Sequence, residues 1–80
     1  MQLKIVLLAH LDKYLPNCGG EGNSCLLELD GDATVEELLS ILAIPIEIPK
    51  VIMINNCYGN LQDSLKNGDK ITIFPPICGG

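Results

Sequence analysis

The strongest structural signal in the chain is Thr34-Val35-Glu36-Glu37-Leu38-Leu39-Ser40-Ile41-Leu42, residues 34–42. Thr34 and Glu37 have the spacing of a capping box, and the adjacent carboxylates at 36 and 37 favour the positive end of a helix dipole. Four apolar residues recur at helical spacing: Val35, Leu38, Leu39 and Leu42. The pattern predicts one amphipathic helix whose apolar stripe belongs to the core.

Two strands are predicted before this helix. Leu3, Ile5 and Leu7 alternate with polar residues, which indicates a strand with one buried face. For Val6 and Leu8 on the opposite face, burial beneath a helix is favoured over a contact surface. The rest of this half is expected to follow in chain order: one or two helical turns over 10–15, a glycine-rich loop over 16–24, and a strand over 25–29.

The chain after the helix is predicted to return to strands. Pro45 and Pro49 exclude a helix between them, and residues 51–54 are apolar on both faces, as in a central strand. The remaining segments are expected as a turn over 55–60, a short helical turn or edge strand over 61–65, a tight turn over 66–69 and a last strand over 71–74.

This order of elements predicts an α+β fold. A β-grasp (ubiquitin-like) architecture fits best, with a mixed sheet, one main helix packed on it and an extended C-terminal tail. Eighty residues suffice for one domain. We expect residues 1–74 to form the β-grasp domain and residues 75–80 a flexible diglycine tail.

The composition excludes several classes of function. The net charge is −5 with five lysines and no arginine, which argues against nucleic-acid binding. The acidity suits docking on an electropositive partner, or equally a face kept for solubility. The apolar run at residues 1–9 is at the short end for a signal peptide and no segment is long enough to cross a membrane, so a cytoplasmic protein is expected.

The four cysteines form no recognisable metal motif. Cys18, Cys25, Cys57 and Cys78 contain no C-x-x-C pair, and the single histidine, His10, lies far from zinc-finger spacing. Reduced, structural thiols are favoured for the first three, over a disulfide scaffold or a metal site. No internal set of residues has a catalytic spacing, so we expect neither a bound metal nor a conventional active site.

The C-terminal segment does carry chemistry: Phe74-Pro75-Pro76-Ile77-Cys78-Gly79-Gly80. A terminal glycine presents a carboxylate with no side chain beside it, so that attack on a nucleotide phosphate and later displacement by sulfur meet little hindrance. A diglycine can also enter a narrow tunnel in another protein. Pro75 and Pro76 favour extended geometry that projects the tail, which argues against an ordinary frayed terminus.

The end of the chain resembles a known family. Residues 65–80 place a Leu-x-x-Gly-Asp turn before the last strand and Phe-Pro-Pro-x-x-Gly-Gly after it, as in the MoaD/ThiS family of ubiquitin-like sulfur carrier proteins. The helix start at 34–39 and the strand at 51–55 are similar too. Phe74-Pro75-Pro76 and the segment 10–15 place the chain nearer MoaD, the small subunit of molybdopterin synthase. The short link at 44–50 is closer to ThiS, and a thiol at Cys78 departs from both.

The resemblance implies a sulfur carrier that is not itself an enzyme. Gly80 would be adenylated and thiocarboxylated, and it would donate sulfur in molybdopterin (Mo/W cofactor) biosynthesis. Residues 74–79 would bind partners, namely Phe74, Pro75, Pro76, Ile77, Cys78 and Gly79. The implied partners are an E1-like adenylyltransferase (MoeB/ThiF-like) that uses ATP, a MoaE-like large synthase subunit, and a sulfur donor such as a cysteine desulfurase or rhodanese. No cofactor, nucleic acid or membrane would be bound by the chain itself.

Three alternatives to this function stay open. They are a ThiS-like carrier for thiamine thiazole synthesis, a ubiquitin-like protein modifier, and a β-grasp interaction module that is never activated. Cys78 either fills a tolerant position or uses its thiol on the activated Gly80 carbonyl or in persulfide exchange. The tail sequence alone does not separate these roles.

Overall fold

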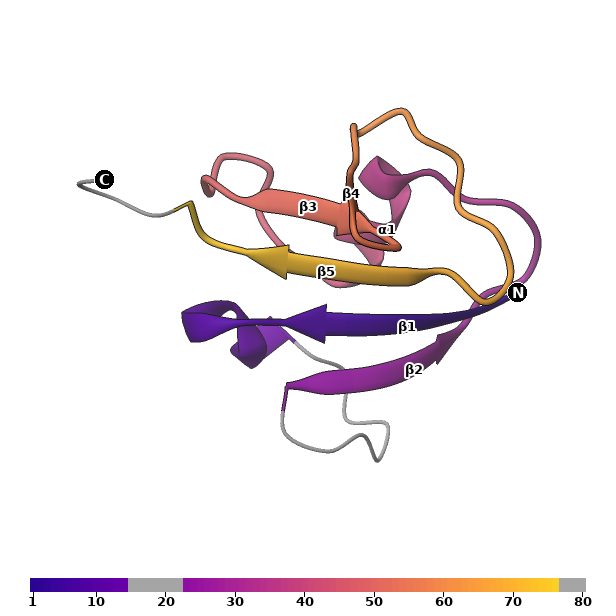
Figure 1. Cartoon of the computed structure of the whole chain (residues 1–80), viewed down its shortest axis with the longest axis horizontal. Helices are drawn as coiled ribbons and strands as arrows, with labels where there is room; N and C mark the ends of the chain where they lie inside the picture. The colour runs from indigo at the N-terminus through magenta and orange to yellow at the C-terminus, as the bar shows by residue number, and fades with distance from the viewer. Residues whose placement is uncertain (15–22, 77–80) are drawn as a thin grey trace.

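The computed structural model describes residues 1–14 and 23–76, without the side chains of residues 10 and 12. Five strands form one mixed sheet in the order β2-β1-β5-β3-β4 (Figure 1). The elements are β1 (Gln2–Leu7), the 3-10 helix η1 (Ala9–Tyr14), β2 (Ser24–Glu28), α1 (Val35–Ile41), β3 (Val51–Ile54), β4 (Cys57–Tyr58) and β5 (Lys70–Phe74). The predicted α+β class, with a mixed sheet and one main helix, is confirmed.

The middle of the sheet is the parallel pair of β1 and β5. The inward side chains of these strands, Leu3, Ile5, Leu7, Ile71 and Ile73, are completely buried. All other strand pairs are antiparallel. The central place predicted for residues 51–54 is therefore only partly right: β3 has neighbours on both sides, but β4 is two residues long and β5 occupies the centre.

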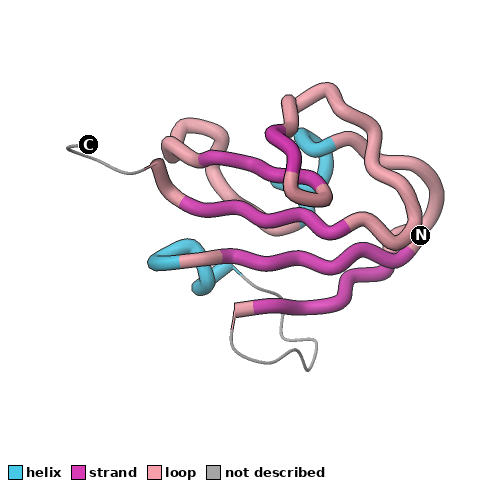
Figure 2. Tube along the Cα trace, in the orientation of Figure 1, coloured by secondary structure: helices cyan, strands magenta, loops and turns pink. Residues whose placement is uncertain are grey.

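The helix α1 begins where its capping box predicts. The Thr34 hydroxyl accepts a hydrogen bond from the Glu37 amide (3.3 Å), and the Glu37 carboxylate accepts one from the Thr34 amide (2.9 Å). The first amides of a helix have no hydrogen-bond partner within the helix, and a capping box supplies partners for two of these unpaired donors. α1 lies across one face of the sheet (Figure 2), and no helix formed by the described residues lies across the other face.

The hydrophobic core lies between α1 and the sheet. The predicted stripe of α1 is buried throughout, and the core joins it to the inward strand residues, to η1, to the loop after α1 and to the segment before β5. Its members are Leu3, Ile5, Leu7, Leu11, Val35, Leu38, Leu39, Leu42, Ile44, Ile52, Leu65, Ile71 and Ile73. No polar side chain is buried within the described part of the chain. Aliphatic packing therefore accounts for this core.

Several local predictions are corrected by the structure. Val6 and Leu8 are only partly buried, because within residues 1–14 and 23–76 no helix covers the face of β1 on which Val6 lies. Residues 61–65 form neither a helical turn nor an edge strand; Ser64 makes a single bridge to Thr34, and Leu65 packs into the core. The turn predicted over 55–60 contains the short strand β4.

Other local predictions are confirmed or lie outside the described residues. The helical turns expected over 10–15 appear as η1, and the loop expected over 16–24 falls mainly within residues 15–22, which are not described. Cys25 is disulfide-bonded, so the predicted reduced thiol is wrong there. Sequence spacing could not show this, because a disulfide depends on how two Cβ atoms meet in space.

Candidate functional site: the end of β5 and the open sheet face

The chain leaves the sheet at the carboxyl end of β5. There β5 is held on both sides: the Leu8 amide donates a hydrogen bond to the Ile73 carbonyl (3.0 Å), and Phe74 stands opposite Val51 of β3. Pro75 follows immediately and has no amide hydrogen to donate, so pairing stops at this residue. The start of the C-terminal segment is thereby fixed relative to the fold.

Three of the predicted site residues lie in the described part of the chain. Phe74 is half-buried on the helix-free face of the sheet, Pro75 is half-buried and Pro76 is exposed. Ile77, Cys78, Gly79 and Gly80 lie outside the described residues. The structure thus positions the base of the predicted tail, and the roles assigned to its last four residues stay predictions.

The helix-free side of the sheet adjoins the tail base through Phe74. Strand register brings together side chains from four strands there, which we call the open face: Val6, Val51, Met53, Tyr58, Thr72 and Phe74. Met53 stands opposite both Tyr58 and Thr72, and Tyr58 is 80% exposed. Such a run of apolar groups, unpartnered and continuous with Phe74, has the character of a contact surface.

Sequence reasoning missed most of the open face. The sequence pattern places Met53 in a central strand, and it does not single out Tyr58 or Thr72. The sequence does contain one signal of this surface, since residues 51–54 are apolar on both faces. Only one face of this strand packs against the core, so the apolar residues of the other face are left for a contact surface. The neighbours that complete the surface come from distant segments and become visible only once the strand order is known.

The described residues contain no group of side chains suited to holding a metal ion. No cluster of three or more His, Cys, Asp or Glu side chains forms among them. Cys57, on the short edge strand β4, is a free thiol and is exposed, unlike the structural thiol that was predicted. No helix in the described part of the chain is long and apolar enough to cross a membrane.

The family can now be assigned. The model of the ThiS family matches residues 18–80. The chain belongs to the ThiS family. This match confirms the resemblance to the MoaD/ThiS sulfur carriers and covers the helix, the last four strands and the C-terminal segment. No curated protein sequence matches the chain significantly.

Solved structures agree with the ThiS-family assignment at the level of the fold. SAMP1 from Haloferax volcanii matches with a TM-score of 0.73 at 22% identity, covering 100% of both chains. Molybdopterin converting factor subunit 1 from Pyrococcus furiosus gives a TM-score of 0.72 at 21% identity, over 95% of this chain and 98% of that one. A chain in the complex of molybdopterin-converting factor subunits 1 and 2 from Helicobacter pylori gives a TM-score of 0.64 at 22% identity, over 100% of this chain and 100% of that one. The β-grasp architecture is therefore shown, whereas identities this low say nothing of the pathway.

Proposed function

We propose that this chain is a cytoplasmic sulfur carrier for molybdopterin biosynthesis, acting as a co-substrate of partner enzymes. The observation that carries the proposal is the tail base, where β5 pairs with β1 up to Ile73 and with β3 up to Phe74, and Pro75 then ends the pairing. A carrier needs a chemically simple terminus held clear of a compact body. Membership of the ThiS family supports this assignment.

The proposed chemistry takes place on the carboxylate of Gly80. A carboxylate oxygen attacks the α-phosphorus of ATP, and pyrophosphate leaves. A sulfur nucleophile from a donor protein then attacks the acyl carbon of the adenylate, and AMP leaves. If the donor presents this sulfur as a persulfide, the product is an acyl disulfide between Gly80 and the donor. A thiol reductant then attacks the donor's sulfur, so that the donor ends in a disulfide with this thiol and Gly80 keeps the thiocarboxylate. ATP and the catalytic residues belong to the activating enzyme, and this chain supplies the acyl group and its docking surfaces.

Two features support molybdopterin over thiamine as the destination of the sulfur. η1 (Ala9–Tyr14) directly follows β1, as does the short helical segment that MoaD proteins carry. Phe74-Pro75-Pro76 matches the MoaD form of the tail. The proposed partners are a MoeB/ThiF-like E1 enzyme, a rhodanese or cysteine desulfurase as donor, and a MoaE-like large subunit. The similar structure from Helicobacter pylori is a complex of subunits 1 and 2 of molybdopterin-converting factor.

Intact-mass spectrometry of the full chain tests the proposal. After incubation with ATP, an E1-like adenylyltransferase and a sulfur donor, we expect the mass to rise by the difference between one sulfur and one oxygen atom. Deletion of Gly80 should abolish the change. An unmodified mass with an enzyme that thiocarboxylates its own carrier would refute activation and favour an interaction module, and lysine-linked conjugates would favour a modifier.

The destination is tested separately with the thiocarboxylated chain. We expect a MoaE-like subunit to convert a pterin precursor to the dithiolene with it. Sulfur delivery to a thiazole synthase in place of the pterin reaction would overturn the molybdopterin assignment while leaving the carrier chemistry intact.

A further inference from the structure

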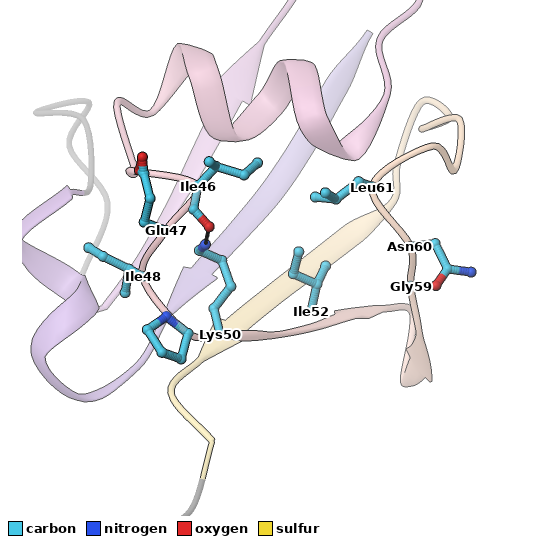
Figure 3. A pocket seen from close by; sticks show the side chains of 9 residues that line it. Ile46, Glu47, Ile48, Lys50, Ile52, Gly59, Asn60 and Leu61 are labelled. Carbon is cyan, nitrogen blue, oxygen red and sulfur yellow. Dashed lines mark hydrogen bonds between the residues drawn. The ribbon is translucent and has the colours of Figure 1, made fainter.

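A second apolar surface lies on the α1 side of the sheet, away from the open face. Two hollows of about 360 and 300 Å³ open there, and Ile46 lines both of them. We call the apolar residues that line one or both hollows the Ile46 groove: Leu39, Ile44, Ile46, Ile48, Ile52 and Leu61. In Figure 3, Ile46 and Leu61 extend toward each other with Ile52 between them, beneath α1. The chemistry of the tail uses none of these residues.

The loop that carries Ile46 is closed by its own hydrogen bonds. The Ile44 amide donates to the Leu39 carbonyl (3.0 Å), and the Ile48 amide donates to the Pro45 carbonyl (3.2 Å). The Lys50 ammonium reaches back and donates to the Ile46 carbonyl (3.2 Å; Figure 3). Ile46 is nevertheless 51% exposed. A large apolar side chain is thus presented to solvent by a preformed loop, which lowers the entropic cost of binding a partner.

The rim of the Ile46 groove is acidic. Glu36 lines one hollow and Glu47 the other, and both residues are exposed. Among the described residues that line the two hollows, Lys50 is the single cation. Its ammonium is directed to the Ile46 carbonyl, and burial lowers its pKa. Lys50 also interacts with Glu47, so the two carboxylates and one ammonium leave the rim with a net negative charge, of which Glu36 is the carboxylate in the hollow without a cation.

We infer that the Ile46 groove binds a basic, apolar peptide segment of a partner protein. The complementary charges identify the occupant, since apolar side chains fill the hollows and lysine or arginine side chains meet Glu36 and Glu47. A second copy of this chain is disfavoured because its net charge is −5, and an anionic membrane surface is disfavoured for the same reason. Because the open face lies on the other side of the sheet, both surfaces can be occupied at once.

Fluorescence anisotropy with a labelled probe peptide tests this inference. The probe is an amphipathic helical peptide of leucine and lysine, and its control replaces each lysine by glutamate. We expect the full chain to bind the lysine peptide and not the glutamate peptide. Ile46→Ser should weaken binding about 10-fold, the effect of losing burial of one isoleucine. Leu26→Ser, at a side chain 57% exposed on β2, should leave the affinity unchanged.

Two variants of equal net charge separate groove binding from general attraction to an acidic protein. Glu36→Gln/Glu47→Gln should weaken binding several-fold more than Glu28→Gln/Asp30→Asn, whose carboxylates lie outside the groove. Equal affinities for these two variants, wild-type affinity in Ile46→Ser, or no binding of the lysine peptide would each overturn the inference. Deletion of Gly80 should leave peptide binding unchanged, so the result is independent of the proposed sulfur chemistry.

Discussion

Thr34 shows how much one side chain contributes to the fold. It closes both halves of the capping box with Glu37, so Thr34→Ala removes the hydroxyl acceptor at the start of α1. We expect a loss of about 1 kcal/mol in the free energy of unfolding, measured by urea denaturation. Ser40→Ala, at an exposed position later in the same helix, is the matched control and should have little effect. Equal losses in the two variants would mean that the cap is not the cause.

Lys50 should make the free energy of unfolding depend on pH, and the direction follows from the shift of its pKa. Burial lowers its pKa from 10.5, and Glu47 opposes this by raising it. Between the lowered pKa and 10.5, the unfolded chain binds more protons than the folded chain, so stability rises with pH through that window. Relative to Lys50→Met, the wild-type chain should therefore gain free energy of unfolding as the pH rises from neutral to about 10.5. A difference between the two proteins that stays constant with pH would contradict this.

The β3–β4 hairpin is decided by its two central residues. Asn55 and Asn56 both have positive φ, at 51° and 72°, and Ile54 pairs directly with Cys57 across the turn. This is the geometry of a two-residue hairpin that prefers Asn-Gly. Asn56→Gly should keep or increase the thermal midpoint, because glycine has no Cβ. Asn56→Ala should cost up to about 1 kcal/mol, because alanine lacks the short polar side chain that lets asparagine adopt a positive φ. Thermal denaturation followed by circular dichroism measures both, and a midpoint lowered by glycine would refute the turn assignment.

The elements that could be predicted from the sequence are those with a complete local signal. The capping box and apolar stripe of α1, and the alternation in β1, each depend on residues close in the chain, and all are confirmed. β4 was missed because two residues cannot show a period, and its pairing depends on the turn at Asn55 and Asn56. The disulfide of Cys25 was missed because no local pattern reports which sulfur atoms meet.

On the scale of the whole molecule, the open face and the Ile46 groove lie on opposite sides of the sheet, and the sequence alone could not show this. The end of the last strand at Phe74 could be predicted because Pro75 and Pro76 follow it directly in the chain, and the binding role of these residues stays a prediction. The open face could not be predicted, because its side chains converge through the β1–β5 and β3–β5 pairings, which join segments far apart in the chain. The same holds for the Ile46 groove, where the loop after α1 meets Leu61.

The final prediction tests whether the open face serves the proposed carrier function. An activating enzyme must hold the carrier body while it acts on Gly80, and Met53 lies on the open face that continues into Phe74. Met53→Asp places a charge among Tyr58 and Thr72, so the rate of thiocarboxylation should fall about 10-fold or more, since burying the carboxylate in an apolar contact is costly. The rate is followed by intact mass at limiting enzyme.

The matched control for Met53→Asp is Ile41→Asp. Ile41 is 52% exposed at the end of α1, on the other side of the sheet, so this variant makes the same change of net charge and should keep the wild-type rate. Both variants should retain the circular dichroism spectrum of the folded chain, because neither side chain belongs to the buried core. Equal slowing by the two would show that acidity alone impairs activation. Slowing by Ile41→Asp alone would place the activating enzyme on the helix side, where it would compete with the partner of the Ile46 groove.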